Sequence, residues 1–123
     1  MEFDTLSNKV IGAAIEVHRH LGPGLLESAY EECLSFELNE LRIKFERQKP
    51  LPVIYKTIKL EIGYRIDLLV ENYIVAELKT VDKLNKVFEA QILSYMKFSG
   101  TKIGLLINFR EVLLKDGIKR FVL

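Results

Sequence analysis

The sequence contains a single cysteine, Cys33, among its 123 residues. An internal disulfide is therefore excluded, and a reducing compartment such as the cytoplasm is the expected location. The first residues lack the basic-then-apolar layout of a secretion signal. Apolar runs are also short, and none approaches the roughly 20 residues that a membrane-spanning helix needs. We therefore expect no membrane partner.

The chain has no large excess of either positive or negative charge, because the formal net charge is only +1. A protein that grips nucleic acid through many phosphates usually carries a basic excess, since each neutralised phosphate releases counterions. Any nucleic-acid surface must therefore be local. Two groups of basic residues are candidates for it, Lys44, Arg47, Lys49, Lys56, Lys59 and Arg65 on one side and Lys79, Lys83 and Lys86 on another. A solvated surface explains the same side chains equally well.

The remaining composition is that of an ordinary globular protein. Apolar residues make up 49% of the chain and charged residues 28%. A chain of this length can bury a sizeable core but is too short for two domains. We therefore expect a single domain over residues 1–123, without internal repeats or linkers.

Hydrophobic spacing predicts two helices at the start of the chain. Apolar residues recur with helical spacing over 7–20, where Ser7 is the expected N-cap and the Gly22-Pro23-Gly24 segment ends the helix. The second helix is expected to begin at Leu25 or Glu27 and to end at Leu41. Its buried face would consist of Leu26, Tyr30, Cys33, Leu34, Leu38 and Leu41.

After residue 42 the pattern changes to short segments rich in β-forming residues. Strands are expected at 43–48, 53–55, 58–64, 66–70 and 73–81, followed by a helix over 84–99 that Gly100 ends, a buried strand over 103–109 and a last strand over 118–123. The order of elements, ααβββ(β)αββ, indicates an α/β domain with a central mixed sheet flanked by helices.

The most informative feature is Asp67 on one predicted strand, followed on the next by Glu77-Leu78-Lys79. Side chains two residues apart on a strand point to the same face, so Glu77 and Lys79 are neighbours. Two carboxylates can hold a hard divalent cation through oxygen, and an amine two residues away can reach the same point. Two carboxylates side by side repel each other unless a cation joins them.

The loop between these strands decides whether the carboxylates meet. A two-residue turn after Val70 would place Asp67 opposite Ala76, so that Asp67 and Glu77 would face opposite sides of the sheet. A three-residue turn would set Asp67 directly across from Glu77. We therefore expect an odd-numbered loop or a bulge, with Asn72 a candidate for positive φ. The other face of both strands is apolar and is expected to be core: Ile66, Leu68, Val70, Ile74, Ala76 and Leu78.

With these residues the chain resembles the PD-(D/E)XK nuclease superfamily, and within it the small bacterial proteins named for a GxxExxY motif. The resemblance covers nearly the whole chain and rests on the segments 24–30 (GLLESAY), 64–70 (YRIDLLV), 77–79 (ELK), 90–95 (AQILSY), 104–109 (GLLINF) and 118–120 (IKR). It implies a restriction-endonuclease-like core. RecB-like members of the family also carry a glutamine and a tyrosine four residues apart on the following helix, as Gln91 and Tyr95 are here.

The resemblance further implies a metal-dependent phosphodiesterase that acts on nucleic acid, with DNA favoured over RNA. Asp67 and Glu77 would bind Mg²⁺, or Mn²⁺ as a substitute, together with the main-chain carbonyl of Leu78. Glu27 would contact the metal through water or bind a second ion. Lys79 would orient or help to deprotonate the attacking water and offset charge on the phosphate.

Four more residues take supporting roles in this interpretation. Gln91 and Tyr95 would steady Lys79 or the substrate, and Tyr30 and Arg65 would support the site. The family often has a histidine near Phe88, so Phe88 is a departure from its pattern. Each residue also has an ordinary structural explanation: Glu27 suits a helix's first turn, tyrosines often lie in cores, and the charged residues can form surface ion pairs.

Two functions from different classes therefore stand. The first is a Mg²⁺-dependent nuclease that uses Glu27, Asp67, Glu77, Lys79 and Gln91. The second is a non-catalytic nucleic-acid-binding or assembly module that retains the nuclease fold. A homodimer is a further expectation, because a domain this small could cover more substrate as a pair.

Overall fold

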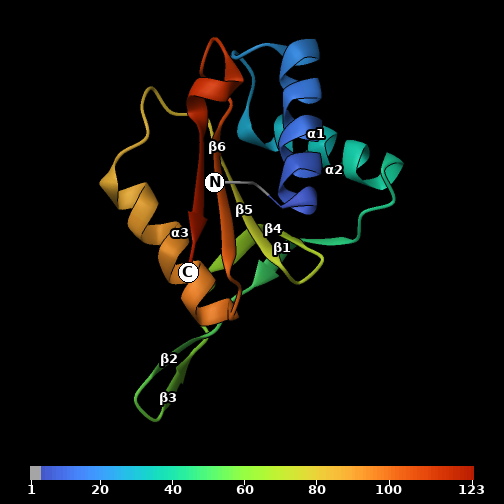
Figure 1. Ribbon diagram of the computed structural model, residues 1–123. Coiled ribbons are helices and arrows are strands. Elements are labelled where there is room, and N and C mark those ends of the chain that lie inside the picture. The colour runs from blue at the N-terminus through green and yellow to red at the C-terminus, as the bar shows by residue number, and fades with distance from the viewer. Residues whose placement is uncertain (1–3) are drawn as a thin grey trace.

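The computed structural model describes residues 4–123, which form three layers (Figure 1). Helices α1 (Thr5–Leu21) and α2 (Glu27–Glu40) pack on one face of a five-stranded sheet, and α3 (Lys86–Ser99) packs on the other. The expected α/β architecture, a mixed sheet flanked by helices, is confirmed. Among the described residues, no helix is long and apolar enough to cross a membrane.

The sheet has the strand order β1-β4-β5-β6-β7. Only the β5–β6 pair is parallel, and α3 makes the crossover between these two strands. The strands are β1 (Phe45–Pro50), β4 (Arg65–Val70), β5 (Ile74–Lys79), β6 (Ile103–Asn108) and β7 (Ile118–Val122). The short helix η1 (Leu114–Gly117) precedes β7.

Two short strands form a separate hairpin. Strands β2 (Val53–Tyr55) and β3 (Ile58–Leu60) pair only with each other. Their hairpin projects away from the three layers (Figure 1). The expected strand over 58–64 is therefore shorter, because the chain leaves β3 after Leu60 to return to the sheet at Arg65.

The start of α1 differs from the sequence-based expectation. Asp4, not Ser7, is the N-cap: its Oδ1 accepts from the Ser7 main-chain N at 2.9 Å and its Oδ2 from Ser7 Oγ at 2.7 Å. Ser7 is fully buried inside the first turn. Aspartate caps helices as well as serine does, and it lies three residues earlier, where its carboxylate reaches the free N–H groups. The predicted end is confirmed, with Gly22 at φ 73° after the helix.

The buried face of α2 is also partly different. Tyr30, Leu34 and Leu38 are fully buried as expected, and Cys33 is partly buried. Leu26 and Leu41 are instead 78% and 48% exposed. These two residues are the N-cap and C-cap of α2, so their backbones lie outside the helical periodicity that was used to place them.

The core lies on both faces of the sheet. One cluster fills the space under α1 and α2, and a second lies under α3. All six apolar residues expected at the inner face of β4 and β5 are fully buried. Five of them face α1 and α2, but Ile66 packs in the α3 cluster. Residues two apart on a regular strand share a face, so the placement of Ile66 and Leu68 on opposite faces shows that the alternation of β4 is broken between them.

Candidate active site

The β4–β5 hairpin has the odd loop that the shared site requires. Val70 pairs with Ile74, which leaves a three-residue turn over 71–73. Asn72 has a φ of 52°, as expected, and Glu71 shares the left-handed conformation with a φ of 54°. This register brings Asp67 and Glu77 to facing positions on neighbouring strands.

Asp67 lies where β4 loses regular pairing with both of its neighbours. The β4–β5 ladder extends from the turn only as far as Leu68–Ala76, so Asp67, the residue before Leu68 in the chain, is left without a ladder partner on β5. On the other side, the β1–β4 register skips the pair that Asp67 would make with Gln48. Gln48 has a φ of 50°, a conformation that is uncommon in a strand for a residue other than glycine. The sheet is therefore interrupted on both sides of one carboxylate.

Side chains take over the hydrogen bonds that the interruption removes. Glu77 Oε2 accepts from the Asp67 main-chain N at 2.8 Å, and Asp67 Oδ2 accepts from the Leu78 main-chain N at 2.9 Å. Gln48 Nε2 donates to Asp67 Oδ1 at 3.2 Å. Buried main-chain N–H groups need a partner, and the two carboxylates supply it here. They are consequently held at fixed positions before any ligand binds.

The two carboxylates are hard to ionise together. Glu77 is only 3% exposed. Its burial, together with the charge of Asp67, raises its pKa to about 8. Burial also raises the pKa of Asp67, although the hydrogen bond from Leu78 works in the opposite direction. A positive charge placed between these groups would favour both anionic forms.

Lys79 is the cation that faces this pair. It lies two residues after Glu77 on β5, and its charge lowers the pKa of Glu77, Asp67 and Glu27 against the larger effect of burial. Lys79 Nζ donates to Gln91 Oε1 on α3 at 3.1 Å. It also lies 5.2 Å from the ring centroid of Phe88, within the range of a cation–π contact. Phe88 therefore supports the Lys79 ammonium from α3.

Gln91 links Lys79 to Tyr95 one turn further along α3. Gln91 Nε2 donates to the Tyr95 hydroxyl at 3.3 Å while its Oε1 accepts from Lys79. Burial and the negative charge of Glu77 raise the pKa of Tyr95. The three polar side chains form a continuous hydrogen-bonded chain from β5 across the face of α3.

Glu27 is the first residue of α2 and is positioned by Tyr30. The Tyr30 hydroxyl donates to the Gly22 carbonyl and accepts from the Leu25 main-chain N at 3.1 Å, so it ties down the loop before Glu27. The Tyr30 ring stacks on Phe109 of the core, with centroids 4.5 Å apart. Burial and the charge of Asp67 raise the pKa of Glu27, which places its carboxyl in the same electrostatic environment as the β4–β5 pair.

Two residues at the site were missed by the sequence reasoning. Glu31 lies one turn after Glu27, and its Oε1 accepts from Gln48 Nε2 at 2.6 Å. Gln48 thus bridges Glu31 to Asp67. The four-residue spacing of Glu27 and Glu31 was a usable signal, because it puts both acids on one helix face. Gln48 had no comparable signal, since its position depends on the interruption of β1.

The basic residues near the site have separate partners. Arg47 binds Glu31 and Glu32 on α2, at 3.1 and 2.8 Å, so it is an internal contact between β1 and α2. Arg65 Nη1 donates to the Gln48 main-chain carbonyl at 3.1 Å and supports the unusual conformation of that residue. Arg65 therefore acts on the site through Gln48.

A family comparison agrees with this arrangement. The model of the PD-(D/E)XK nuclease superfamily matches residues 4–121. The chain belongs to this superfamily. Neither the curated proteins nor the solved structures gave a match. Membership in the superfamily indicates a metal-dependent nuclease, and it agrees with the observed mixed sheet and three helices.

The donor set suits the divalent cation that such nucleases use. Asp67, Glu77, Glu27 and Glu31 offer only oxygen, the element that hard divalent cations prefer. Burial raises the pKa of Glu77, Asp67 and Glu27, and neighbouring negative charge adds to it, so a bound cation would favour their anionic forms. Within residues 4–123, however, no three acidic, histidine or cysteine side chains are arranged to hold one ion. The carboxylates of Asp67 and Glu77 are instead engaged by main-chain N–H groups.

Proposed function

We propose that this chain is a Mg²⁺-dependent nuclease that hydrolyses phosphodiester bonds of nucleic acid, with DNA favoured over RNA. The observation that carries the proposal is the pair of adjacent carboxylates, buried Glu77 and partly buried Asp67, at an interruption of the sheet, with Lys79 two residues after Glu77 on β5. A structural role alone gives no reason to bury two adjacent carboxyls, because each raises the cost of ionising the other.

Each residue of the site has a distinct part in the proposal. Asp67 and Glu77 would hold the metal together with the Leu78 main-chain carbonyl, and Glu27 would reach it through water. Bound Mg²⁺, or Mn²⁺ in its place, would supply electrostatic stabilisation of the charge that develops on the phosphate. Each main-chain N–H uses one oxygen of a carboxylate, so Glu77 Oε1 and, beside its bond from Gln48, Asp67 Oδ1 can still offer lone pairs to a cation.

Lys79 would orient the attacking water and offset charge on the phosphate. Its ammonium has three donors, and Gln91 uses one of them at 3.1 Å. The Gln91 contact and the Phe88 ring limit the directions in which the flexible lysine side chain can point. Tyr95 fixes the Gln91 amide in turn, so that its oxygen faces Lys79.

The same proposal identifies the segment from Gly24 to Tyr30 as the GxxExxY motif. Tyr30 holds the loop, and Glu27 presents its carboxyl from the first turn of α2. A cytoplasmic location, expected from the lone Cys33, also belongs to the proposal.

The experiment is a cleavage assay with purified protein on single- and double-stranded DNA and RNA, with Mg²⁺, Mn²⁺ or EDTA. Metal-dependent cleavage that Asp67→Asn and Lys79→Ala both abolish supports the proposal. Cleavage that survives both substitutions equally would indicate a contaminant and remove the proposed mechanism. A rise in Tm with Mg²⁺ that Asp67→Asn abolishes would independently report metal binding.

A second candidate function is a module that binds nucleic acid without cutting it. Its specific support is that the carboxylates of Asp67 and Glu77 are occupied by main-chain donors in the described part of the chain. This candidate predicts salt-dependent binding, no rise in Tm with Mg²⁺ and no cleavage of any of the four substrates.

A further inference from the structure

A cavity of about 290 Å³ opens beside Gln91 and Tyr95, next to the candidate active site. Helix α3 contributes Gln91, Ser94, Tyr95 and Phe98 to its lining. The opposite wall consists of Tyr64 and the base of the β2–β3 hairpin, at Val53 and Leu60. Because Gln91 also binds Lys79, a single amide connects the cavity to the lysine of the candidate active site.

The chemistry of the lining suits a flat, partly polar ring. Tyr64 and Tyr95 meet edge to face, with centroids 6.4 Å apart and an interplanar angle of 62°. Phe98 adds a third aromatic side chain. The Ser94 hydroxyl and the Gln91 amide offer a few hydrogen-bonding groups in an otherwise apolar cavity. Aromatic walls with sparse polar groups are the usual way in which proteins bind an unpaired nucleobase.

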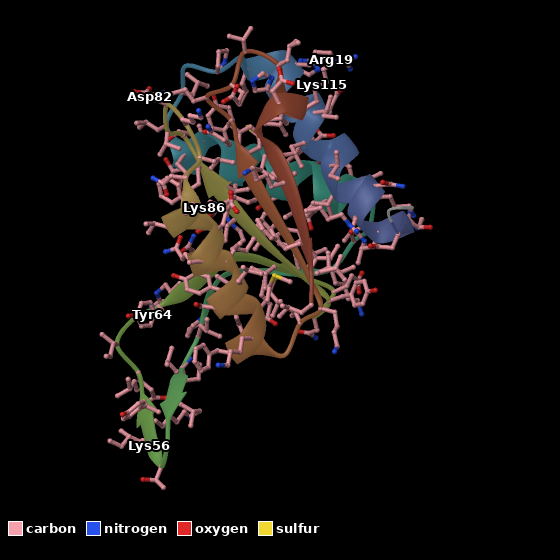
Figure 2. The ribbon with its side chains drawn as sticks, turned by 60° about the vertical axis from the view of Figure 1, so that its left-hand side comes forward. Arg19, Lys56, Tyr64, Asp82, Lys86 and Lys115 are labelled. Carbon is pink, nitrogen blue, oxygen red and sulfur yellow. The ribbon has the colours of Figure 1, made fainter. Side chains whose placement is uncertain are left out.

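The hairpin extends this lining outward as an exposed strip. Val53 pairs with Leu60, and Tyr55 pairs with Ile58, so all four side chains lie on one face of the hairpin. Tyr55 and Ile58 are 57% and 54% exposed. Figure 2 shows the hairpin projecting beyond the body of the protein, with Tyr64 at its base and Lys56 near its tip.

The charges along this surface are mainly positive. Lys56 Nζ lies 5.4 Å from the Tyr55 ring centroid, and Lys97 Nζ lies 5.5 Å from that of Phe98. Lys59 pairs with Ile54, so it lies on the other face of the hairpin, beside Glu61 at 3.6 Å. Lys56 and Lys97 therefore supply the positive charge of this surface. A second copy of the chain packed on the same strip would bring these lysines against each other. A phosphate backbone complements them instead.

We propose that this cavity is a subsite for an unpaired nucleobase of the nucleic-acid strand that is cut, and that Lys56 and Lys97 contact the phosphates of that strand. A base inside a duplex cannot enter, because both of its faces are stacked and its edge is paired. The substrate is therefore single-stranded or locally unpaired next to the scissile phosphate. The inference rests on the proposed nuclease function and names its substrate class.

The test fills the cavity without touching the catalytic residues. Ser94 is exposed and lines the cavity, so Ser94→Phe places an aromatic ring where the base would lie. The matched control is Asn39→Phe, which adds the same ring at an exposed position of α2 on the opposite side of the sheet. Binding of a fluorescently labelled single-stranded DNA oligonucleotide and of the same sequence as a duplex is measured by anisotropy in EDTA, where no cleavage occurs.

We expect Ser94→Phe to weaken single-strand binding about tenfold, the effect of losing one stacked base. Asn39→Phe should bind like the wild type, and duplex binding should change less than twofold in either variant. The dependence of log K on log salt should stay the same in Ser94→Phe, because no phosphate contact is removed. Lys56→Ala with Lys97→Ala should instead reduce that slope.

Three results would overturn the inference. One is unchanged single-strand binding in Ser94→Phe, and another is wild-type binding that does not favour the single strand over the duplex. The third is a wild-type dimer in gel filtration that Ser94→Phe dissociates, because the strip would then be a contact between copies. A second measurement uses the same oligonucleotide with 2-aminopurine, whose fluorescence should be quenched by wild type and not by Ser94→Phe.

The outcomes also separate this inference from the proposed function. Binding that behaves as expected without any metal-dependent cleavage would refute the nuclease and leave the base subsite standing. Cleavage of duplex DNA at the same rate by wild type and Ser94→Phe would refute the subsite and leave the nuclease standing.

Discussion

The main-chain N–H of Asp67 donates to Glu77 Oε2 at 2.8 Å, where a regular ladder would give it a main-chain carbonyl. One residue further along β5, the Leu78 N–H donates to Asp67 Oδ2 at 2.9 Å. A main-chain N–H of each strand therefore donates to the acidic side chain of the other strand. This exchange holds the buried carboxyl of Glu77 beside the partly buried carboxyl of Asp67, where burial opposes the ionisation of both.

Replacing Glu77 should make the metal-free protein more stable. Burial and the charge of Asp67 raise the pKa of Glu77 to about 8, so at neutral pH the folded state must take up a proton that the unfolded state lacks. Glu77→Gln removes this cost, and its amide oxygen can still accept from Asp67. We expect the free energy of unfolding in urea with EDTA to rise by about 1–3 kcal/mol.

The control is Glu40→Gln, an exposed acid at the end of α2, which should change stability by only a few tenths of a kcal/mol. Glu77→Gln should also lose the Tm increase caused by Mg²⁺. A variant that is less stable than the wild type at pH 7 would contradict the explanation.

Replacing Lys79 should abolish activity while leaving the fold intact. Its ammonium is the proposed donor to the attacking water and to the phosphate, and the loss of one such group costs on the order of 10²–10³ in rate. We expect Lys79→Ala to lower the cleavage rate by that factor at saturating substrate. Lys83→Ala changes an exposed lysine in the following loop and should retain wild-type activity. Equal activity in the two variants would exclude Lys79 from the chemistry.

Removing the Tyr30 hydroxyl should disturb the position of Glu27, although the two side chains need not touch. Tyr30→Phe keeps the ring that stacks on Phe109, but it leaves the Leu25 N–H and the Gly22 carbonyl without their side-chain partner. We expect a loss of about 1–2 kcal/mol in the free energy of unfolding. Cleavage should fall as well, because the loop before Glu27 is no longer held. Tyr73→Phe, at a residue 42% exposed, is the control and should change neither quantity.

The stability of the protein should fall in mild acid through Asp4. Burial opposes the charge on Asp4, but hydrogen bonds from Ser7 and Arg120 outweigh it and lower the pKa from 3.8 to about 2. The contribution of the ionised carboxylate is therefore present above pH 4 and is lost as the pH falls towards 2. Asp4→Asn keeps a good N-cap, but it removes the charge together with the Oδ2 acceptor that Ser7 Oγ and Arg120 use.

Urea unfolding between pH 3 and 7 measures this effect. Asp4→Asn should be less stable than the wild type by about 1–2 kcal/mol at pH 7, and the difference should shrink steadily below pH 4. Asp116→Asn, at an exposed position of η1, should show no such trend. A difference that is independent of pH would mean that the charge of Asp4 does not contribute.

Local chemistry explains why much of the fold could be predicted. Glycines at the ends of α1 and α3 and the alternation of β5 act over a few residues, so they can be recognised in the chain itself. The three-residue turn followed from one requirement, that Asp67 and Glu77 share a site. The errors at Ser7, Leu26 and Leu41 all fall at helix ends, where spacing alone does not fix a residue's role: Ser7 was expected as the N-cap of α1, and Leu26 and Leu41 were expected on the buried face of α2.

The order of the elements and the β4–β5 register were thus settled by the amino-acid sequence, because hydrophobic period and turn length act along the chain. The interruption at Asp67 was decided only by tertiary structure. Gln48 comes from β1 and Glu31 from α2, and their meeting at Asp67 depends on how those elements pack. The raised pKa of Glu77 has the same origin, since burial and a facing carboxylate are properties of the assembled sheet.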